Sequence, residues 1–177
     1  MLKVLMVLLT GFGPFYGVPE NTSERILPEL TTAIELLCGE GKTFSPKVLK
    51  VEPGTLGDSA LESKEVILSF GVHPGSEIRI ERAARNIFEG ALIDPKRPLA
   101  EVSWGSFVPT SLEGEAHGFQ VKLGNETSAG QYVCNDTYYR AIQAGKRAYF
   151  IHIPNTSKQF DKSLTAALSE ISCTLLE

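Results

Sequence analysis

The sequence predicts an α/β protein in three layers, with helices on both sides of a sheet. Short apolar segments of strand length alternate with longer segments that have the spacing of amphipathic helices, and this alternation favours a sheet enclosed between helices. The chain has 177 residues, which is within the usual size of one domain. No internal repeat, low-complexity segment or linker-like boundary divides it, so we expect a single domain over residues 1–177.

The first strand and the first helix have clear signals. Residues 3–9 are a nearly continuous aliphatic run, which is expected of a strand covered on both faces. Residues 11–20 are rich in glycine, proline and aromatic residues and predict a loop. Asn21 and Glu24 have the spacing of a capping box, so a helix is expected to start there and to end before Gly39.

The middle of the chain is less regular. Residues 48–51 and 66–70 are apolar and predict two further strands. Residues 80–87 have helical spacing, but the segment is too short for periodicity to decide its structure. Residues 90–128 are rich in glycine, proline and serine and predict hairpins or long loops.

The last third of the chain returns to regular patterns. Residues 135–144 predict a helix that Gly145 closes. Residues 148–153 are a compact apolar run and predict a strand. From Phe160 to Leu175 the apolar residues follow the spacing that is typical of an amphipathic helix packed on a core.

The composition excludes several classes of partner. The formal net charge of −4 disfavours nucleic acid, because phosphates bind to concentrated basic surfaces. No run of about 18 apolar residues is present that would span a bilayer. The apolar N-terminus is short and lacks the small-residue cleavage site of a secretory signal. We therefore expect neither a nucleic-acid nor a membrane partner.

The chain has three cysteines, and their spacing fits neither a disulfide framework nor a zinc site. We therefore expect free thiols, a reducing compartment and a cytoplasmic location. Cys38 and Cys173 lie within apolar helical patterns, so they are expected to be small buried side chains without chemistry.

Cys134 is the candidate nucleophile. It follows a turn of small residues at 128–130 and precedes Asn135 and Asp136, which are good helix caps. A thiol at the N-terminus of a helix meets the positive end of the peptide dipole, which favours the nucleophilic thiolate. A purely structural turn is the competing interpretation, and position alone leaves it open.

A cysteine nucleophile needs a base, and the chain offers three histidines. His152 is the best candidate because it lies near the C-terminal end of a predicted strand, where ligands gather in open α/β sheets. His73 follows another strand in a glycine-containing loop at a plausible site rim, whereas His117 is expected at the surface. Glu81 is the leading carboxylate to orient the base, followed by Asp136.

Four blocks of sequence, taken in order, resemble a known family. They are residues 10–15 with 21–23, residues 80–86, residues 128–135 and residues 150–154. They read Thr-Gly-Phe-Gly-Pro-Phe with Asn-Thr-Ser, Ile-Glu-Arg-Ala-Ala-Arg-Asn, Ser-Ala-Gly-Gln-Tyr-Val-Cys-Asn and Phe-Ile-His-Ile-Pro. These blocks resemble those of the pyroglutamyl peptidase I family, the pyrrolidone-carboxylate cysteine peptidases. The resemblance spans most of the chain.

The resemblance implies a fold, a reaction and three roles. The fold is an α/β/α sandwich around a mixed sheet, as in phosphorylase/hydrolase-like proteins. The reaction is hydrolysis of the amide that follows an N-terminal pyroglutamate, through a thioester intermediate. In this reaction Cys134 is the nucleophile, His152 the base and Glu81 the orienting acid.

The resemblance also implies how substrate is held. Phe12 and Phe15 line the pocket for the lactam ring, and Asn21 orders the loop that carries them. The partners are peptides with an N-terminal pyroglutamate, and no metal or organic cofactor is required. Relatives form dimers and tetramers, so a homo-oligomer is expected.

Two other functions stay open. The family usually has Gly-Arg after the third strand, where this chain has Gly75 and Ser76, so the role of that arginine is vacant or passes to Arg79. A homologue altered in this way would bind pyroglutamyl peptides without turnover. A nucleoside-phosphorylase-like enzyme of the same fold is the second alternative.

Overall fold

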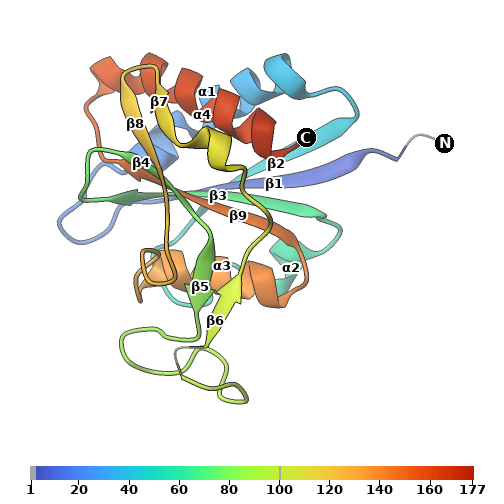
Figure 1. Cartoon of the computed structure of the whole chain (residues 1–177), viewed down its shortest axis with the longest axis vertical. Helices are drawn as coiled ribbons and strands as arrows, with labels where there is room; N and C mark the ends of the chain where they lie inside the picture. Colours follow the sequence, from blue (N-terminus) through green and yellow to red (C-terminus); the bar gives the residue numbers. More distant parts are fainter. Residues whose placement is uncertain (1–2, 100) are drawn as a thin grey trace.

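The computed structural model describes residues 3–99 and 101–177, and in these ranges a mixed sheet lies between two layers of helices (Figure 1). The strands are β1 Leu5–Phe12, β2 Lys42–Leu49, β3 Val66–His73, β4 Ile78–Glu81, β5 Ala83–Arg85, β6 Val102–Trp104, β7 Gly114–Ala116, β8 Phe119–Leu123 and β9 Arg147–Pro154. The helices are α1 Thr22–Cys38, α2 Asp58–Leu61, α3 Val133–Gln143 and α4 Asp161–Leu175, with short 3-10 turns at Thr110–Leu112 and Lys158–Phe160. α1 and α4 cover one face of the sheet, and α2 and α3 lie on the other (Figure 1). This arrangement confirms the predicted fold class.

The main sheet has the strand order β2-β1-β3-β9-β4-β8-β7. The first four strands of this order are parallel to one another, whereas β4 is antiparallel to β9 and β7 is antiparallel to β8. A separate ribbon of β5 and β6 packs beside α3 (Figure 1). Because parallel strands end at the same edge of a sheet, the carboxyl ends of β1, β3 and β9 meet there.

The core consists of two apolar layers, one on each face of the sheet. Leu68 and Ile151 point toward α1 and α4, whereas their neighbours Ile67 and Phe150 point toward α3. Successive side chains of a strand alternate between faces, so the continuous apolar runs of β3 and β9 supply both layers. No helix within the described ranges has the length and apolar character needed to cross a membrane.

One predicted strand is longer than expected, one undecided segment forms strands, and a third segment agrees with its prediction. The strand predicted at 48–51 is the end of β2, which starts at Lys42. Because β2 is an edge strand, it tolerates Pro46 and several polar side chains, and these obscure its apolar pattern. Residues 80–87 contain the end of β4 and all of β5 rather than a helix. The hairpin of β7 and β8 is of the kind predicted for residues 90–128.

The start of α3 also differs. The helix begins at Val133, two residues before the predicted start, and its N-cap Tyr132 makes no capping hydrogen bond through its side chain. Asn135 and Asp136 therefore lie inside the first turn rather than at the cap. Cys134 is the second residue of the helix, so its position at the helix N-terminus agrees with the prediction.

The expectation of three free thiols is wrong. Cys38 at the end of α1 and Cys173 near the end of α4 form a disulfide, with their Cα atoms 5.8 Å apart. The two cysteines are separated by 135 residues, and only the packing of α1 against α4 brings them together. Cys134 keeps a free, half-buried thiol.

Candidate active site

A cavity of about 560 Å³ lies at the edge where the parallel strands end. This is the position at which open α/β sheets gather ligands. Its walls come from the ends of β1, β3 and β9, from β4, from the start of α3 and from neighbouring loops. The residues that line it are Phe12, Phe15, Asn21, Val51, Pro53, Val72, His73, Pro74, Arg79, Phe88, Glu89, Ser128, Ala129, Tyr132, Val133, Cys134 and His152.

Cys134 enters this cavity from the first turn of α3. Gly71 of β3 faces its thiol, and a Cβ atom at Gly71 would lie 2.7 Å from Sγ and 2.9 Å from Cζ of Phe150. A side chain at that position would displace the sulfur, so the absence of one makes room for the thiol. The thiol lies at the positive end of the α3 dipole.

His152 lies on β9 directly across from Arg79 of β4 in the antiparallel register. Its Nδ1 atom makes a hydrogen bond of 2.8 Å with Oε1 of Glu81, and both side chains are buried. Burial alone would lower the pKa of His152, but the neighbouring Cys134 sulfur and the Glu81 carboxylate outweigh it and raise the pKa to about 9. The imidazole is therefore protonated at neutral pH.

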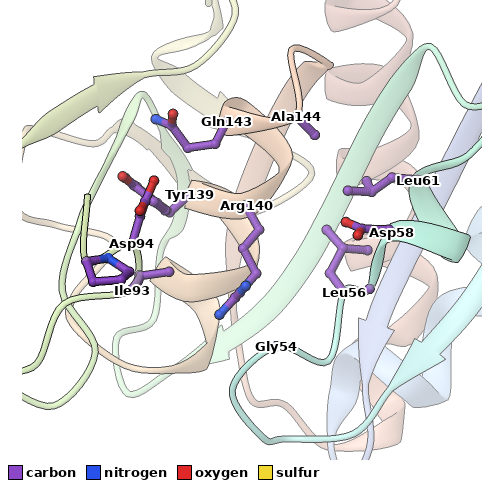
Figure 2. A pocket seen from close by; sticks show the side chains of 12 residues that line it. Gly54, Leu56, Asp58, Leu61, Ile93, Asp94, Tyr139, Arg140, Gln143 and Ala144 are labelled. Atoms are coloured by element: carbon purple, nitrogen blue, oxygen red, sulfur yellow. The ribbon is translucent and has the colours of Figure 1, made fainter. Parts of the chain in front are cut away.

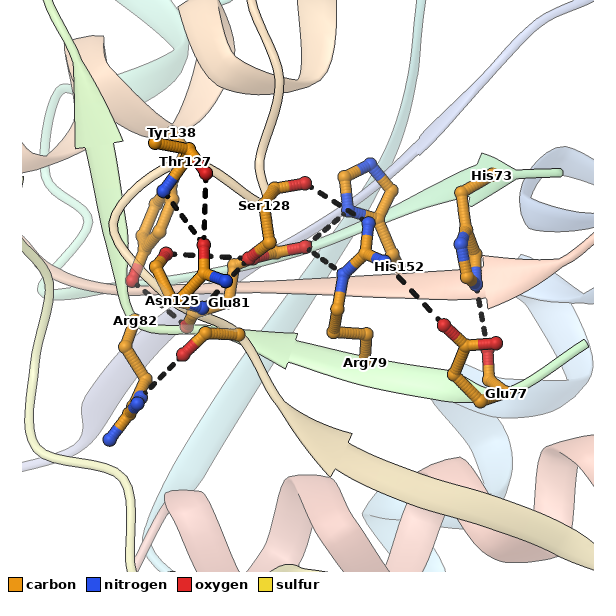
Figure 3. A network of polar contacts seen from close by, with 11 residues as sticks. His73, Glu77, Arg79, Glu81, Arg82, Asn125, Thr127, Ser128, Tyr138 and His152 are labelled. Carbon is orange, nitrogen blue, oxygen red and sulfur yellow. Dashed lines mark hydrogen bonds and ion pairs between the residues drawn. The ribbon is translucent and has the colours of Figure 1, made fainter. Parts of the chain in front are cut away.

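Glu81 is the centre of a polar network (Figure 3). Besides His152, Arg79 donates to its carboxylate from Nε at 2.7 Å, and the hydroxyl of Ser128 donates to the other oxygen. Burial would raise the pKa of Glu81, but the hydrogen bonds from His152, Ser128 and Arg79 lower it below its usual range. The carboxylate is therefore ionised beside a protonated imidazole.

The loop predicted to hold substrate reaches the same cavity. Phe12 ends β1 and is buried, Phe15 is partly exposed, and both line the cavity with Asn21. The Asn21 side chain caps α1 by accepting from the N–H of Ser23 at 3.0 Å, and it donates to the carbonyl oxygen of Gly13 at 3.1 Å. Asn21 thus joins the loop to the start of the helix.

Asn135 joins the opposite wall to α3. Its amide donates to the carbonyl oxygens of Arg85 and Ile87, and its oxygen accepts from the N–H of Arg85, each at 2.9 Å. The following residues, Phe88 and Glu89, line the cavity. The helix that carries Cys134 therefore also holds this loop.

The other two histidines occupy different environments. His73 lines the cavity as predicted, its ring centroid lies 5.5 Å from that of His152, and its Nε2 atom lies 2.7 Å from the carbonyl oxygen of Glu77. Burial lowers the pKa of His73, so it is neutral at pH 7. His117 is exposed and pairs with Glu170 on α4, away from the cavity.

A second cavity, of about 490 Å³, lies between α2 and α3 (Figure 2). Its charged lining residues are Asp58, Asp94 and Arg140, and it is lined by neither cysteine nor histidine. Arg140 donates to Asp136 at 3.0 Å, and the N–H of Gly54 also donates to Asp136. The carboxylate of Asp136, the second candidate to orient the base, thus pairs with Arg140 and the N–H of Gly54 and not with His152.

Two contributors to the site, Ser128 and Gly71, were missed at the sequence level, and Arg79 was expected only as a replacement for the family's arginine. In the structure Arg79 and Ser128 donate hydrogen bonds to Glu81, and Gly71 makes room for Cys134. In a strand, residues two apart share a face, so a predicted strand at 78–81 would have placed Arg79 beside Glu81. The helical spacing of residues 80–87 hid this strand. Across residues 3–99 and 101–177, no cluster of three or more His, Cys, Asp or Glu side chains suits a metal ion.

The chain aligns over most of its length with curated proteins of one kind. The chain is 28% identical to the pyrrolidone-carboxylate peptidase of Pyrococcus furiosus over 176 residues, covering 88% of this chain and 83% of the relative. It is 29% identical to that of Oceanobacillus iheyensis over 175 residues, covering 86% of this chain and 85% of the relative. No protein-family model matches the sequence.

Solved structures show the same relationship in the fold. The pyroglutamyl peptidase I of Bacillus amyloliquefaciens has a TM-score of 0.75 at 22% identity, covering 97% of this chain and 96% of that chain. The pyrrolidone carboxyl peptidase of Thermus thermophilus has a TM-score of 0.74 at 21% identity, covering 94% and 98%. Over most of its length the chain is thus a homologue of curated proteins named pyrrolidone-carboxylate peptidase, and it shares the fold of solved pyroglutamyl peptidase I structures.

Proposed function

We propose that this protein is a cysteine peptidase that removes an N-terminal pyroglutamate by hydrolysing the amide bond after it. The observation that carries the proposal is that Cys134 and His152 line one cavity while the buried carboxylate of Glu81 makes a hydrogen bond with His152. A protonated imidazole beside a thiol favours the thiolate, which is the nucleophile of cysteine peptidases. The names of the curated relatives support the same reaction.

In the proposed first half-reaction, Cys134 thiolate attacks the pyroglutamyl carbonyl carbon and a carbon–sulfur bond forms. The carbonyl oxygen gains negative charge, which backbone N–H groups in the first turn of α3 stabilise, because these groups have no acceptor within the helix. His152 then gives its proton to the leaving nitrogen as the carbon–nitrogen bond breaks. The shortened peptide leaves, and a thioester on Cys134 remains.

In the second half-reaction, neutral His152 accepts a proton from water, and the resulting hydroxide adds to the thioester carbonyl. The carbon–sulfur bond breaks and pyroglutamic acid leaves. Cys134 returns to the thiolate and His152 to the imidazolium. Glu81 keeps its charge throughout, and holds the imidazole by its Nδ1 atom.

The cavity suits the proposed substrate. Pyroglutamate is small, uncharged and carries a lactam amide, so apolar walls with a few polar groups are adequate to bind it. We propose that Phe12 and Phe15 cover the ring while Asn21 fixes their loop. This chemistry needs neither a metal nor an organic cofactor.

The remaining expectations are part of the same proposal. They are a single domain over the whole chain, a homo-oligomer as in the relatives, no nucleic-acid or membrane partner, and a cytoplasmic location. The disulfide between Cys38 and Cys173 weighs against the cytoplasm, where such bonds are uncommon. Trapping thiols by rapid alkylation in cells that produce the protein would show whether this bond exists there.

The decisive experiment measures turnover of a fluorogenic pyroglutamyl amide by the purified protein and by Cys134→Ala. We expect turnover by the first and none by the second, with equal thermal stability. Activity that survives in Cys134→Ala would refute the assignment. Saturable peptide binding without turnover would support a binding protein, and phosphate-dependent cleavage of a nucleoside would support the phosphorylase alternative.

A further inference from the structure

The Glu81 carboxylate is completely buried, yet it is ionised. An ionised group in the protein interior is costly unless other groups pair with it and satisfy its hydrogen bonds. Oε1 accepts from His152 at 2.8 Å and from Arg79 at 2.7 Å, and Oε2 accepts from Ser128. Of these partners, Arg79 is the one whose charge is permanent at any working pH.

Strand geometry aims Arg79 at this carboxylate. Residues two apart in β4 share a face, so Arg79 and Glu81 lie side by side, and the register with β9 sets His152 opposite Arg79. The guanidinium also donates from Nη2 to the carbonyl oxygen of Ser128 at 3.0 Å, while Nη1 lies 3.5 Å from Glu77. Figure 3 shows the Arg79 guanidinium between the carboxylates of Glu77 and Glu81.

We propose that Arg79 is a positioning residue, which keeps Glu81 ionised and aimed at His152. Its effect on turnover rests on the proposed function, but its effect on the imidazole does not. Loss of Arg79 would leave a buried carboxylate with fewer donors and without its permanent countercharge. The carboxylate would then take up a proton more readily and hold the imidazole less firmly.

Removing one positive charge makes protonation easier for every group near it, so the direction of the effect is defined. The titratable and charged side chains around the Glu81 carboxylate and the His152 imidazole are Glu77 just before β4, Arg79 on β4, His73 on β3, Lys122 on β8, and Cys134 and Tyr138 on α3. Loss of Arg79 should therefore raise the pKa values of both Glu81 and His152.

The first test compares Arg79→Gln, Arg79→Lys and Lys122→Gln in pyroglutamyl-amide turnover across pH. Lys122→Gln is a matched control, because Lys122 is exposed and is the register partner of Arg79 but makes no hydrogen bond with Glu81. We expect Arg79→Gln to lower kcat by about 10- to 100-fold, by analogy with the loss of hydrogen-bond partners that orient metal-binding histidines. The acidic limb of its kcat/KM profile should move to higher pH.

In Arg79→Lys the acidic limb of the kcat/KM profile should stay near its original pH, because lysine keeps the positive charge. Its kcat should be lower than in the original protein, because lysine lacks the planar guanidinium that bonds Glu81 and Ser128 together. Lys122→Gln should change both the acidic limb and kcat far less than Arg79→Gln, because the Lys122 ammonium is exposed, screened by solvent and makes no hydrogen bond with Glu81. A merely structural role would lower thermal stability or kcat without moving the pH profile, and that result would overturn the inference.

The second test does not depend on turnover. NMR titration of the three histidines, assigned with His152→Gln, reports the His152 midpoint in the original protein and in the Arg79 and Lys122 variants. We expect an upward shift for Arg79→Gln and little change for Arg79→Lys. An unshifted midpoint in folded Arg79→Gln would overturn the inference. A shifted midpoint in a protein without peptidase activity would uphold it and reject the proposed function.

Discussion

A Cβ atom on Gly71 would lie 2.7 Å from the Sγ atom of Cys134. Gly71 belongs to the buried central strand β3. The same Cβ atom would lie only 2.9 Å from Cζ of Phe150, a neighbour on β9. Neither the strand nor the aromatic ring can retreat in a closely packed interior. The position of the thiol therefore depends on a residue that carries no side chain.

The substitution Gly71→Ala should move the sulfur and reduce kcat/KM by about 100-fold, because a shift of about 1 Å in a reacting group has effects of that size. Turnover of a pyroglutamyl amide measures this effect. Gly57→Ala is the matched control, since Gly57 has negative φ and nothing within 4 Å of its Cβ position. Equal losses in the two variants would contradict the argument.

The activity should fall at alkaline pH as His152 loses its proton. Its pKa is raised from 6.5 to about 9 by Cys134 and Glu81 against the opposing effect of burial, so kcat/KM should decline as the pH passes about 9. The stability of the protein should fall over the same pH range, because the folded state holds this proton more tightly than the unfolded state. The stabilisation by protonated His152 is complete below pH 6.5 and is lost as the pH rises through about 9.

A pH series of kcat/KM, paired with thermal unfolding at each pH, checks this prediction. In His152→Gln the loss of stability at alkaline pH should be smaller, because the imidazole with the raised pKa is absent. An alkaline limb of activity close to pH 6.5 would mean that the charged pair does not exist.

Iodoacetamide should modify one cysteine in the native protein. Cys134 is free and half-buried, whereas Cys38 and Cys173 are joined in a disulfide. Mass spectrometry of the native protein should therefore find a single added group, on Cys134, together with loss of activity. Rapid labelling of all three cysteines without a reducing agent would show that the disulfide is absent.

Removing the disulfide should destabilise the protein without affecting catalysis. It closes a loop of 135 residues, and the loop-entropy relation gives about 4–5 kcal/mol of stabilisation for loops of this size. The double variant Cys38→Ser with Cys173→Ser should thus unfold at lower denaturant concentration. Its kcat/KM should be unchanged, because α1 spans about 25 Å between the cavity end and Cys38. A parallel loss of activity would indicate coupling between the two sites.

Local patterns predicted the elements that local physics determines. The apolar runs of β1, β3 and β9 and the amphipathic spacing of α1 and α4 are visible in sequence because burial selects apolar side chains there. Most of β2 and all of β4 were hidden, for different reasons. β2 is an edge strand with polar side chains, and β4 carries Arg79 and Glu81 on the face that forms the site.

The sequence by itself determined the fold class, the candidate residues Cys134 and His152, and the position of Cys134 at the start of a helix. These follow from periodicity, helix signals and side-chain chemistry, all of which act over a few residues. Only the tertiary structure decided that Glu81 rather than Asp136 meets His152, that Arg79 holds Glu81, and that Cys38 pairs with Cys173. Strand register and helix packing set those contacts between distant segments, and neither can be read from local spacing.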